Sequence, residues 1–240
     1  MFYAGSPSLR QQVLDFIRQQ CTDHPTSLRP VNLTNIWSLL SKYLSGSDSH
    51  DAETHSNMFH DITAIIGALV RLRRDLVSIT LPHLCIVLSQ LIRTLRSPRP
   101  HLGMKQHKLV ADTFPKWIDP SRPLGVDESK ALARLLSTLA TKSIVRTHMQ
   151  DTHKHESLSR PLAKHVTYVI EAYVDALNDP LCGMSTEVRR ELQPGLFILC
   201  GMLSEHARDA LMISALDAGG KTAMKQLWRE YEKQKYVGKG

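Results

Sequence analysis

The last fifth of the chain, LQPGLFILCGMLSEHARDALMISALDAGGKTAMKQLWREYEKQKYVGKG, runs from Leu192 to Gly240 and decides the fold. Apolar residues recur in it at the period of an α-helix that buries one face. Two joints, at 204–206 and 217–220, divide it into three short helices. Helices of this length are not stable alone in water, so they must pack on other parts of the chain. The stretch therefore predicts short helices stacked on one another.

The same helical period continues through the rest of the chain, while the alternation typical of strands is almost absent. The sequence thus predicts an all-α fold of irregular stacked helical hairpins, like the end of a HEAT or armadillo solenoid, with about nine or ten helices. The helices are expected over residues 8–21, 32–44, 55–79, 82–95, 127–143, 159–178, 185–203, 204–217 and 219–235.

A chain of 240 residues can form one large domain or two modest ones. Five prolines interrupt the helical pattern between residues 98 and 125. We expect N-terminal helical hairpins over 1–97, a Pro-rich connection over 98–125 and a C-terminal helical domain over 126–240, joined as one continuous helical unit. Within the connection, Phe114, Trp117 and Ile118 should dock onto the core.

Positive charge is unevenly distributed along the chain, whose formal net charge is +7. Residues 71–108 contain eight basic residues and one acidic residue, and residues 221–240 contain six basic residues and two acidic ones. Such zones are typical of surfaces that meet RNA, although solvated helix faces give the same pattern. The candidate RNA-binding or partner-binding residues are Arg71, Arg73, Arg74, Arg93, Arg96, Lys221, Lys225, Arg229, Lys233 and Lys235.

The last helix carries its basic residues in steps of four, so Lys221, Lys225 and Arg229 share one face. Trp228 should pack inward beside this basic stripe. Gly219-Gly220-Lys221-Thr222 resembles part of a phosphate-binding loop, but that motif needs a glycine where Ala215 stands and a strand before it. A glycine C-cap joining two helices is the better interpretation.

No residues with a catalytic, cofactor-binding or metal-binding signature emerge from the sequence. Cysteine is absent near either histidine group, which favours solvated loop histidines over zinc ligands. The four cysteines are far apart, as expected for reduced thiols of an intracellular protein. No apolar run is long enough for a membrane span, and no small-molecule substrate is implied. The two histidine groups are His50, His55 and His60, and His148, His153 and His155.

The C-terminal block resembles a known family. It carries Pro194-Gly195-Leu196-Phe197, then Ser204-Glu205-His206 and Ala215-Leu216-Asp217, followed by Gly219 or Gly220, Lys225, Leu227, Tyr231 and Lys233. These residues, with the run 162–169 before them, resemble the C-terminal domain of the nucleolar pre-ribosomal-associated, or unhealthy-ribosome-biogenesis, proteins, specifically the second member. The resemblance covers residues 160–235.

The resemblance implies a non-enzymatic scaffold that acts in the nucleolus, inside the nucleus, on early precursors of the large ribosomal subunit. Members of this family are much longer than this chain. The partners implied are a larger helical scaffold, a DEAD-box RNA helicase and pre-rRNA. Two alternatives remain open from the residues themselves: a helical module that binds structured RNA directly, and a hydrolase whose site is not visible in the sequence.

Overall fold

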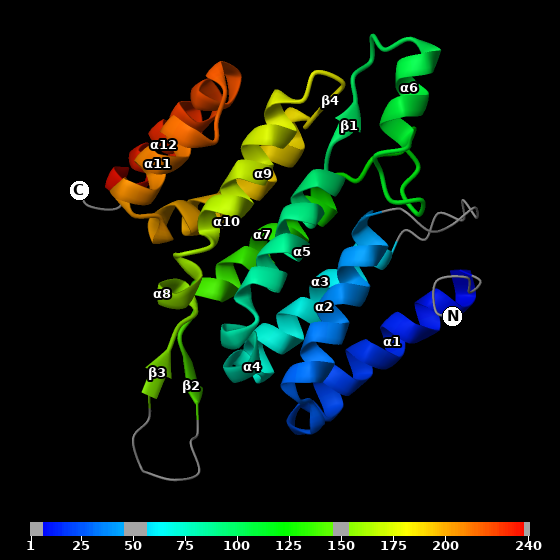
Figure 1. Ribbon diagram of the computed structural model, residues 1–240, viewed down its shortest axis with the longest axis vertical. Coiled ribbons are helices and arrows are strands. Elements are labelled where there is room, and N and C mark those ends of the chain that lie inside the picture. Colours follow the sequence, from blue (N-terminus) through cyan, green and yellow to red (C-terminus); the bar gives the residue numbers. More distant parts are fainter. Residues whose placement is uncertain (1–6, 46–56, 146–153, 238–240) are drawn as a thin grey trace.

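The computed structural model describes residues 7–45, 57–145 and 154–237 (Figure 1). Within these ranges the chain forms twelve α-helices, one 3-10 helix and four short strands. The prediction of an all-α fold built from helical hairpins is confirmed. No helix in the described ranges is long and apolar enough to cross a membrane.

Eight helices form two layers in which each helix packs on the next one of its own layer (Figure 1). The first layer consists of α1 Pro7–Asp23, α3 Met58–Leu72, α7 Val126–Ala140 and α10 Thr186–Met202. The second consists of α2 Pro30–Ser45, α5 Leu81–Thr94, α9 Val166–Asn178 and α12 Ala218–Val237. Successive pairs across the layers are stacked helical hairpins. The last helix before α12, α11 Glu205–Ser214, contacts α9 at the end of the stack.

Three short helices explain why the structure has twelve α-helices where nine or ten were expected. They are α4 Arg74–Ile79, α6 Met104–Ala111 and α8 Ser159–Leu162. The pattern over 55–79 was read as one helix, but the backbone breaks at Arg73, whose φ and ψ are −132° and 47°. Its guanidinium donates to the Pro25 carbonyl at 2.6 Å and to the Leu28 carbonyl at 2.5 Å. Pro25 begins the 3-10 helix Pro25–Ser27, and Leu28 directly follows it. These tertiary bonds hold the break in place.

The strands form two antiparallel pairs that the sequence did not predict. β1 Ser97–Pro98 pairs with β4 Cys182–Gly183, and β2 Ser143–Val145 pairs with β3 Lys154–Glu156. Runs of two or three residues are too short to show alternation.

The helices α10 and α7 cross closely in the core, where Gly195 lies against the backbone of Ala133. A Cβ at Gly195 would lie 2.8 Å from the Ala133 Cα and 3.1 Å from the Leu136 Cβ. Pro194 precedes it inside the helix, and α10 continues to Met202 without a break. Glycine is therefore required here so that the two helices can approach so closely.

Part of the Pro-rich connection docks onto the core, as predicted. Phe114, Trp117 and Ile118 are buried, and the Trp117 indole N–H donates to the Tyr43 carbonyl at 2.8 Å. The segment also contains α6, which extends from the body with Met104 and Leu109 exposed (Figure 1).

An arginine lock joins the C-terminal ends of α5 and α9. Arg96 donates to the Asp179 carboxylate at 2.6 Å, and both side chains are mostly buried. Arg99 donates to the carbonyls of Asp179 and Cys182, beside the β1–β4 pair. The other oxygen of the Asp179 carboxylate accepts the backbone N–H groups of Leu181 and Cys182. The lock thereby holds two neighbouring helices of the second layer together at this end.

The Gly195→Ala substitution should destabilise the protein by about 1–3 kcal/mol, because the added methyl group meets backbone atoms of α7. Urea unfolding followed by circular dichroism measures this. Gly201→Ala is the matched control, since the atom nearest its Cβ is the Tyr231 hydroxyl, the end of a flexible side chain. The control should be neutral or stabilised by up to about 1 kcal/mol. Equal stability of both variants would contradict the close crossing.

Removing the Asp179 carboxylate with Asp179→Ala should cost about 1.5–3 kcal/mol, since Arg96 then remains buried without its charged acceptor. The exposed pair of Arg93 and Asp175, 3.6 Å apart, provides the control. Asp175→Ala should change the free energy of unfolding by less than about 1 kcal/mol. Thermal unfolding of the two variants compares them, and an Asp179→Ala effect as small as that of the control would refute the lock.

Candidate docking surface

The α11–α12 end of the stack is built from the residues that carry the family resemblance. Ser204 caps α11, its hydroxyl accepting the Ala207 N–H at 3.2 Å. Asp217 caps α12, its carboxylate accepting the Gly220 N–H at 2.6 Å and the Asn178 amide at 2.9 Å. The joint between the two helices is therefore fixed to the end of α9.

Gly219 and Gly220 lie in the first turn of α12, so the predicted glycine C-cap is wrong in detail. The cap of α11 is Ala215, and the glycines instead allow α12 to approach α9. A Cβ at Gly219 would lie 2.1 Å from the Asn178 Oδ1. A helix leads into the pair and Asp217 already accepts the Gly220 N–H, which is unlike a phosphate-binding loop.

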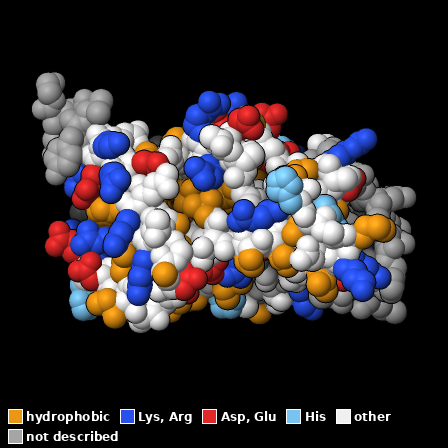
Figure 2. Space-filling view, turned by 90° about the horizontal axis from the view of Figure 1, so that it is seen from above, with side chains coloured by type: hydrophobic (Ala, Val, Ile, Leu, Met, Phe, Trp, Pro, Cys, Tyr) orange, Lys and Arg blue, Asp and Glu red, His pale blue; other side chains and the backbone are white. Residues whose placement is uncertain are grey.

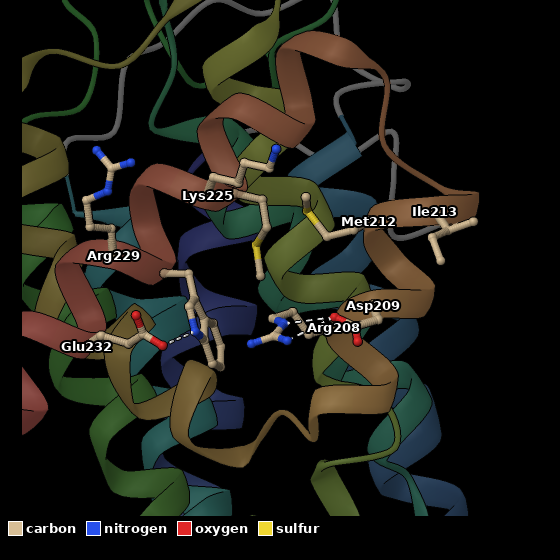
Figure 3. A pocket seen from close by; sticks show the side chains of 9 residues that line it. Arg208, Asp209, Met212, Ile213, Lys225, Arg229 and Glu232 are labelled. Carbon is tan, nitrogen blue, oxygen red and sulfur yellow. Dashed lines mark hydrogen bonds and ion pairs between the residues drawn. The ribbon is translucent and has the colours of Figure 1, made fainter.

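A groove of about 560 Å³ separates α11 from α12 (Figure 3). Its apolar lining comes from Met212 and Ile213 on α11 and from Met224 and Trp228 on α12. Figure 3 shows Arg208 and Met212 directed from α11 toward α12, with Ile213 at the outer rim. The charged residues on its edges are Arg208, Asp209, Lys225, Arg229 and Glu232.

Ile213 is 79% exposed, and α11 has one fully buried residue, Leu211. The outer side of α11 therefore presents apolar surface that nothing in the described part of the chain covers. Sequence reasoning missed the groove because Ile213 shares the helical period of core residues. Which side of α11 meets the core depends on α9 and α12, and the period does not reveal that.

Trp228 is half-buried: it packs against the core, as expected, and it also forms part of the groove wall. The residues of α12 that enter the core are Met224 and Leu227, at 1% and 3% exposure. Arg208 lies over the indole ring with its Cζ 5.0 Å from the centroid, and Tyr231 is 5.2 Å away. The indole N–H donates to Glu232 at 2.9 Å. Trp228 thus holds α11 and α12 together at the groove.

The basic stripe of α12, defined as Lys221, Lys225, Arg229 and Lys233, lies along one edge of this end. Lys225, Arg229 and Lys233 are exposed, and Lys221 is half-buried. In the described part of the chain no carboxylate pairs with these four side chains. In Figure 2, blue side chains lie at this end of the molecule with red ones between them. Lys235 lies outside the stripe, on the side of the helix that carries Tyr231, with its Nζ 5.9 Å from the Tyr231 ring centroid.

The arginines of the first basic zone divide into buried and exposed groups. Arg73 is mostly buried on backbone carbonyls and also pairs with Asp75, which lowers the pKa of that carboxyl. Arg74 is buried and donates to the Val70 and Thr141 carbonyls. Arg96 belongs to the lock with Asp179.

Arg71 is exposed, and Arg93 is half-exposed beside Asp175. The zone also includes α6, whose Lys105 and Lys108 are exposed. The arginines of this zone lie on α3, α4 and α5 or directly after them, and the basic stripe lies on α12, so the structure does not gather the candidate residues into one site.

Burial raises the pKa values of several titratable groups, which makes these groups unreactive near neutral pH. Burial raises the pKa of the Cys21 thiol to about 11 and those of Cys85 and Cys200 to about 12. Burial also raises the pKa of Tyr173 to about 12, at a smaller hollow of about 240 Å³ between α9, α10 and α12. Raised values keep these groups protonated near neutral pH, which makes them poor nucleophiles.

The described residues contain no group of three or more His, Cys, Asp or Glu side chains that could hold a metal ion. His60 of the first histidine group is half-buried on α3, 3.6 Å from Glu128. His50, His55, His148 and His153 lie outside the described residues, as does the side chain of His155.

The layers and the end surface define a protein of stacked helical hairpins. The model of the Urb2/Npa2 family matches residues 11–239, so the chain belongs to this family. Membership implies a role in ribosome biogenesis. Comparison with curated proteins found no match, and comparison with solved structures found none.

Iodoacetamide at pH 8 should leave all four cysteines unmodified while the chain is folded, because each is buried with a raised pKa. Urea should expose them to complete alkylation, which intact mass measures. Rapid modification of one cysteine in the folded chain would reveal a reactive thiol and contradict this picture.

Proposed function

We propose that this chain is a non-enzymatic scaffold in the early assembly of the large ribosomal subunit. It acts in the nucleolus, docks protein partners at the α11–α12 end and contacts pre-rRNA through outward-facing cations. Its partners are other early assembly factors, among them a larger helical scaffold and a DEAD-box helicase. Membership of the Urb2/Npa2 family supports a role in ribosome biogenesis. The basic stripe of α12, which has no carboxylate partner in the described part of the chain, supports contact with RNA.

The basic stripe suits phosphate contact because its charges are not used within the described structure. Three of its four members are exposed, and they follow one another at a spacing of four along the helix. Lysine and arginine that meet phosphates release counterions, so affinity gained in this way falls as salt rises. By contrast, Arg73, Arg74 and Arg96 donate to acceptors of the protein itself. We therefore assign the RNA contact to the stripe and to Arg71, Lys105 and Lys108.

A direct RNA-binding module without a scaffold role is the second candidate, and the same stripe favours it. The α11–α12 end offers little to stack single-stranded bases on, since Trp228 is already covered by Arg208 and Tyr231. The surface suits contact with the phosphate backbone of structured RNA. Such contact would position a scaffold on the RNA as well as it would position a simple RNA-binding module.

Reversal of three charges, K221E/K225E/R229E, should weaken binding to a structured pre-rRNA fragment by at least about tenfold at moderate salt. The dependence of log affinity on log salt should flatten by about two to three. Fluorescence anisotropy of the labelled RNA over a salt series measures both quantities.

The matched control is K142E/R160E/K164E, which makes the same change in net charge at exposed positions around α8. It should retain most of the affinity and the original salt slope. If both triple variants lose affinity equally, the RNA affinity depends on the net charge of the protein, and the assignment of the RNA contact to the stripe is wrong. Affinity unchanged in K221E/K225E/R229E would also refute it.

A further inference from the structure

The groove between α11 and α12 has a shape into which one more helix can pack. Two helices form its walls, and methionine and isoleucine side chains supply adaptable apolar surface. Its volume of about 560 Å³ accommodates several side chains. The ten residues of α11 span about 15 Å, which matches three turns of a partner helix with apolar residues at i, i+3 or i+4, and i+7.

The charges on the edges of the groove indicate which charge a partner helix should carry. Both carboxylates on its edges are engaged, since Asp209 accepts from Arg208 and Glu232 accepts from Trp228. On the α12 edge, Lys225 and Arg229 are exposed and have no carboxylate partner in the described part of the chain. Lys225 and Arg229 outnumber Glu232 on this edge, whose net charge is therefore positive, so a partner gains most by placing carboxylates there.

RNA fits the groove poorly, even though it can meet the outer stripe. Single-stranded bases bind proteins by stacking on exposed aromatic faces. Trp228 is the aromatic residue in the groove wall, and Arg208 and Tyr231 already contact its ring. The rest of the apolar lining is aliphatic or thioether, which packs against apolar side chains of a protein.

We propose that the α11–α12 groove binds an acidic amphipathic helix of a protein partner. The apolar face of that helix covers Met212, Ile213 and Met224, and its carboxylates pair with Lys225 and Arg229. This proposal rests on the proposed scaffold function, because it names the chemistry of the docked partner. It is separable from RNA contact, since the apolar lining has no part in binding phosphates.

Two synthetic helical peptides with the same leucine face provide the first probe, one carrying glutamate at its polar positions and the other lysine. The acidic peptide should bind the chain, and Ile213→Glu should weaken that binding at least tenfold by burying a carboxylate against apolar surface. K225E/R229E should remove the preference for the acidic peptide. Ile79→Glu is the matched control, because Ile79 is 65% exposed on α4, and it should bind like the unchanged chain.

Equal binding of both peptides, no binding of the acidic one, or full binding by Ile213→Glu would overturn the proposal. The RNA affinity of Ile213→Glu should equal that of the unchanged chain. Loss of peptide binding with intact RNA binding in Ile213→Glu thus isolates the groove, whereas Lys225 and Arg229 belong to both the groove edge and the stripe, so their reversal should affect both ligands.

A photo-reactive residue at position 213, in the protein assembled into purified precursor particles, provides the second test. The cross-linked segment should be a protein helix with an apolar face and an acidic edge. A cross-link to RNA, or to a basic or non-helical protein segment, would overturn the proposal.

Discussion

The close crossing of α10 over α7 is the contact on which the C-terminal half of the structure depends. At Gly195 the two backbones approach so closely that a methyl group would meet the Ala133 Cα. From this position α10 supports α12, because Gln193 donates to Glu230 and the Phe197 ring lies 6.0 Å from Tyr231. The basic stripe lies on α12, and α12 also forms one wall of the groove. A residue with no side chain thus sets the position of the surface assigned to function.

Arginine serves two separate purposes in this molecule. Arg73, Arg74 and Arg96 donate to carbonyls and to a carboxylate within the fold, where the planar guanidinium can satisfy several acceptors at once. The α12 stripe, which consists mostly of lysine on an exposed helix face, has no carboxylate partner in the described part of the chain. Total charge and its position along the sequence do not separate the two purposes. The acceptors that use an arginine come from distant parts of the chain, as Thr141 does for Arg74.

Much of the fold could be predicted because helical periodicity and proline or glycine boundaries are local. The pattern predicted most helices of the two layers, and the prediction that Phe114, Trp117 and Ile118 dock was confirmed. The break at Arg73 was missed because distant carbonyls stabilise it. Residue spacing places Trp228 on the inward side of α12, and the structure adds that Met224 and Leu227 are buried more deeply while Trp228 is shared between the core and the groove wall. The groove required two helices in their tertiary positions, so no single segment could reveal it.

Hydrogen exchange of the chain within purified large-subunit precursor particles, compared with the free chain, tests the docking surface most directly. We expect strong slowing of amide exchange in α11 and α12, at 205–237, with the exchange of α2 and α5 nearly unchanged. The same exchange rates for α11 and α12 in the particle and in the free chain would contradict a docking role for this end of the molecule.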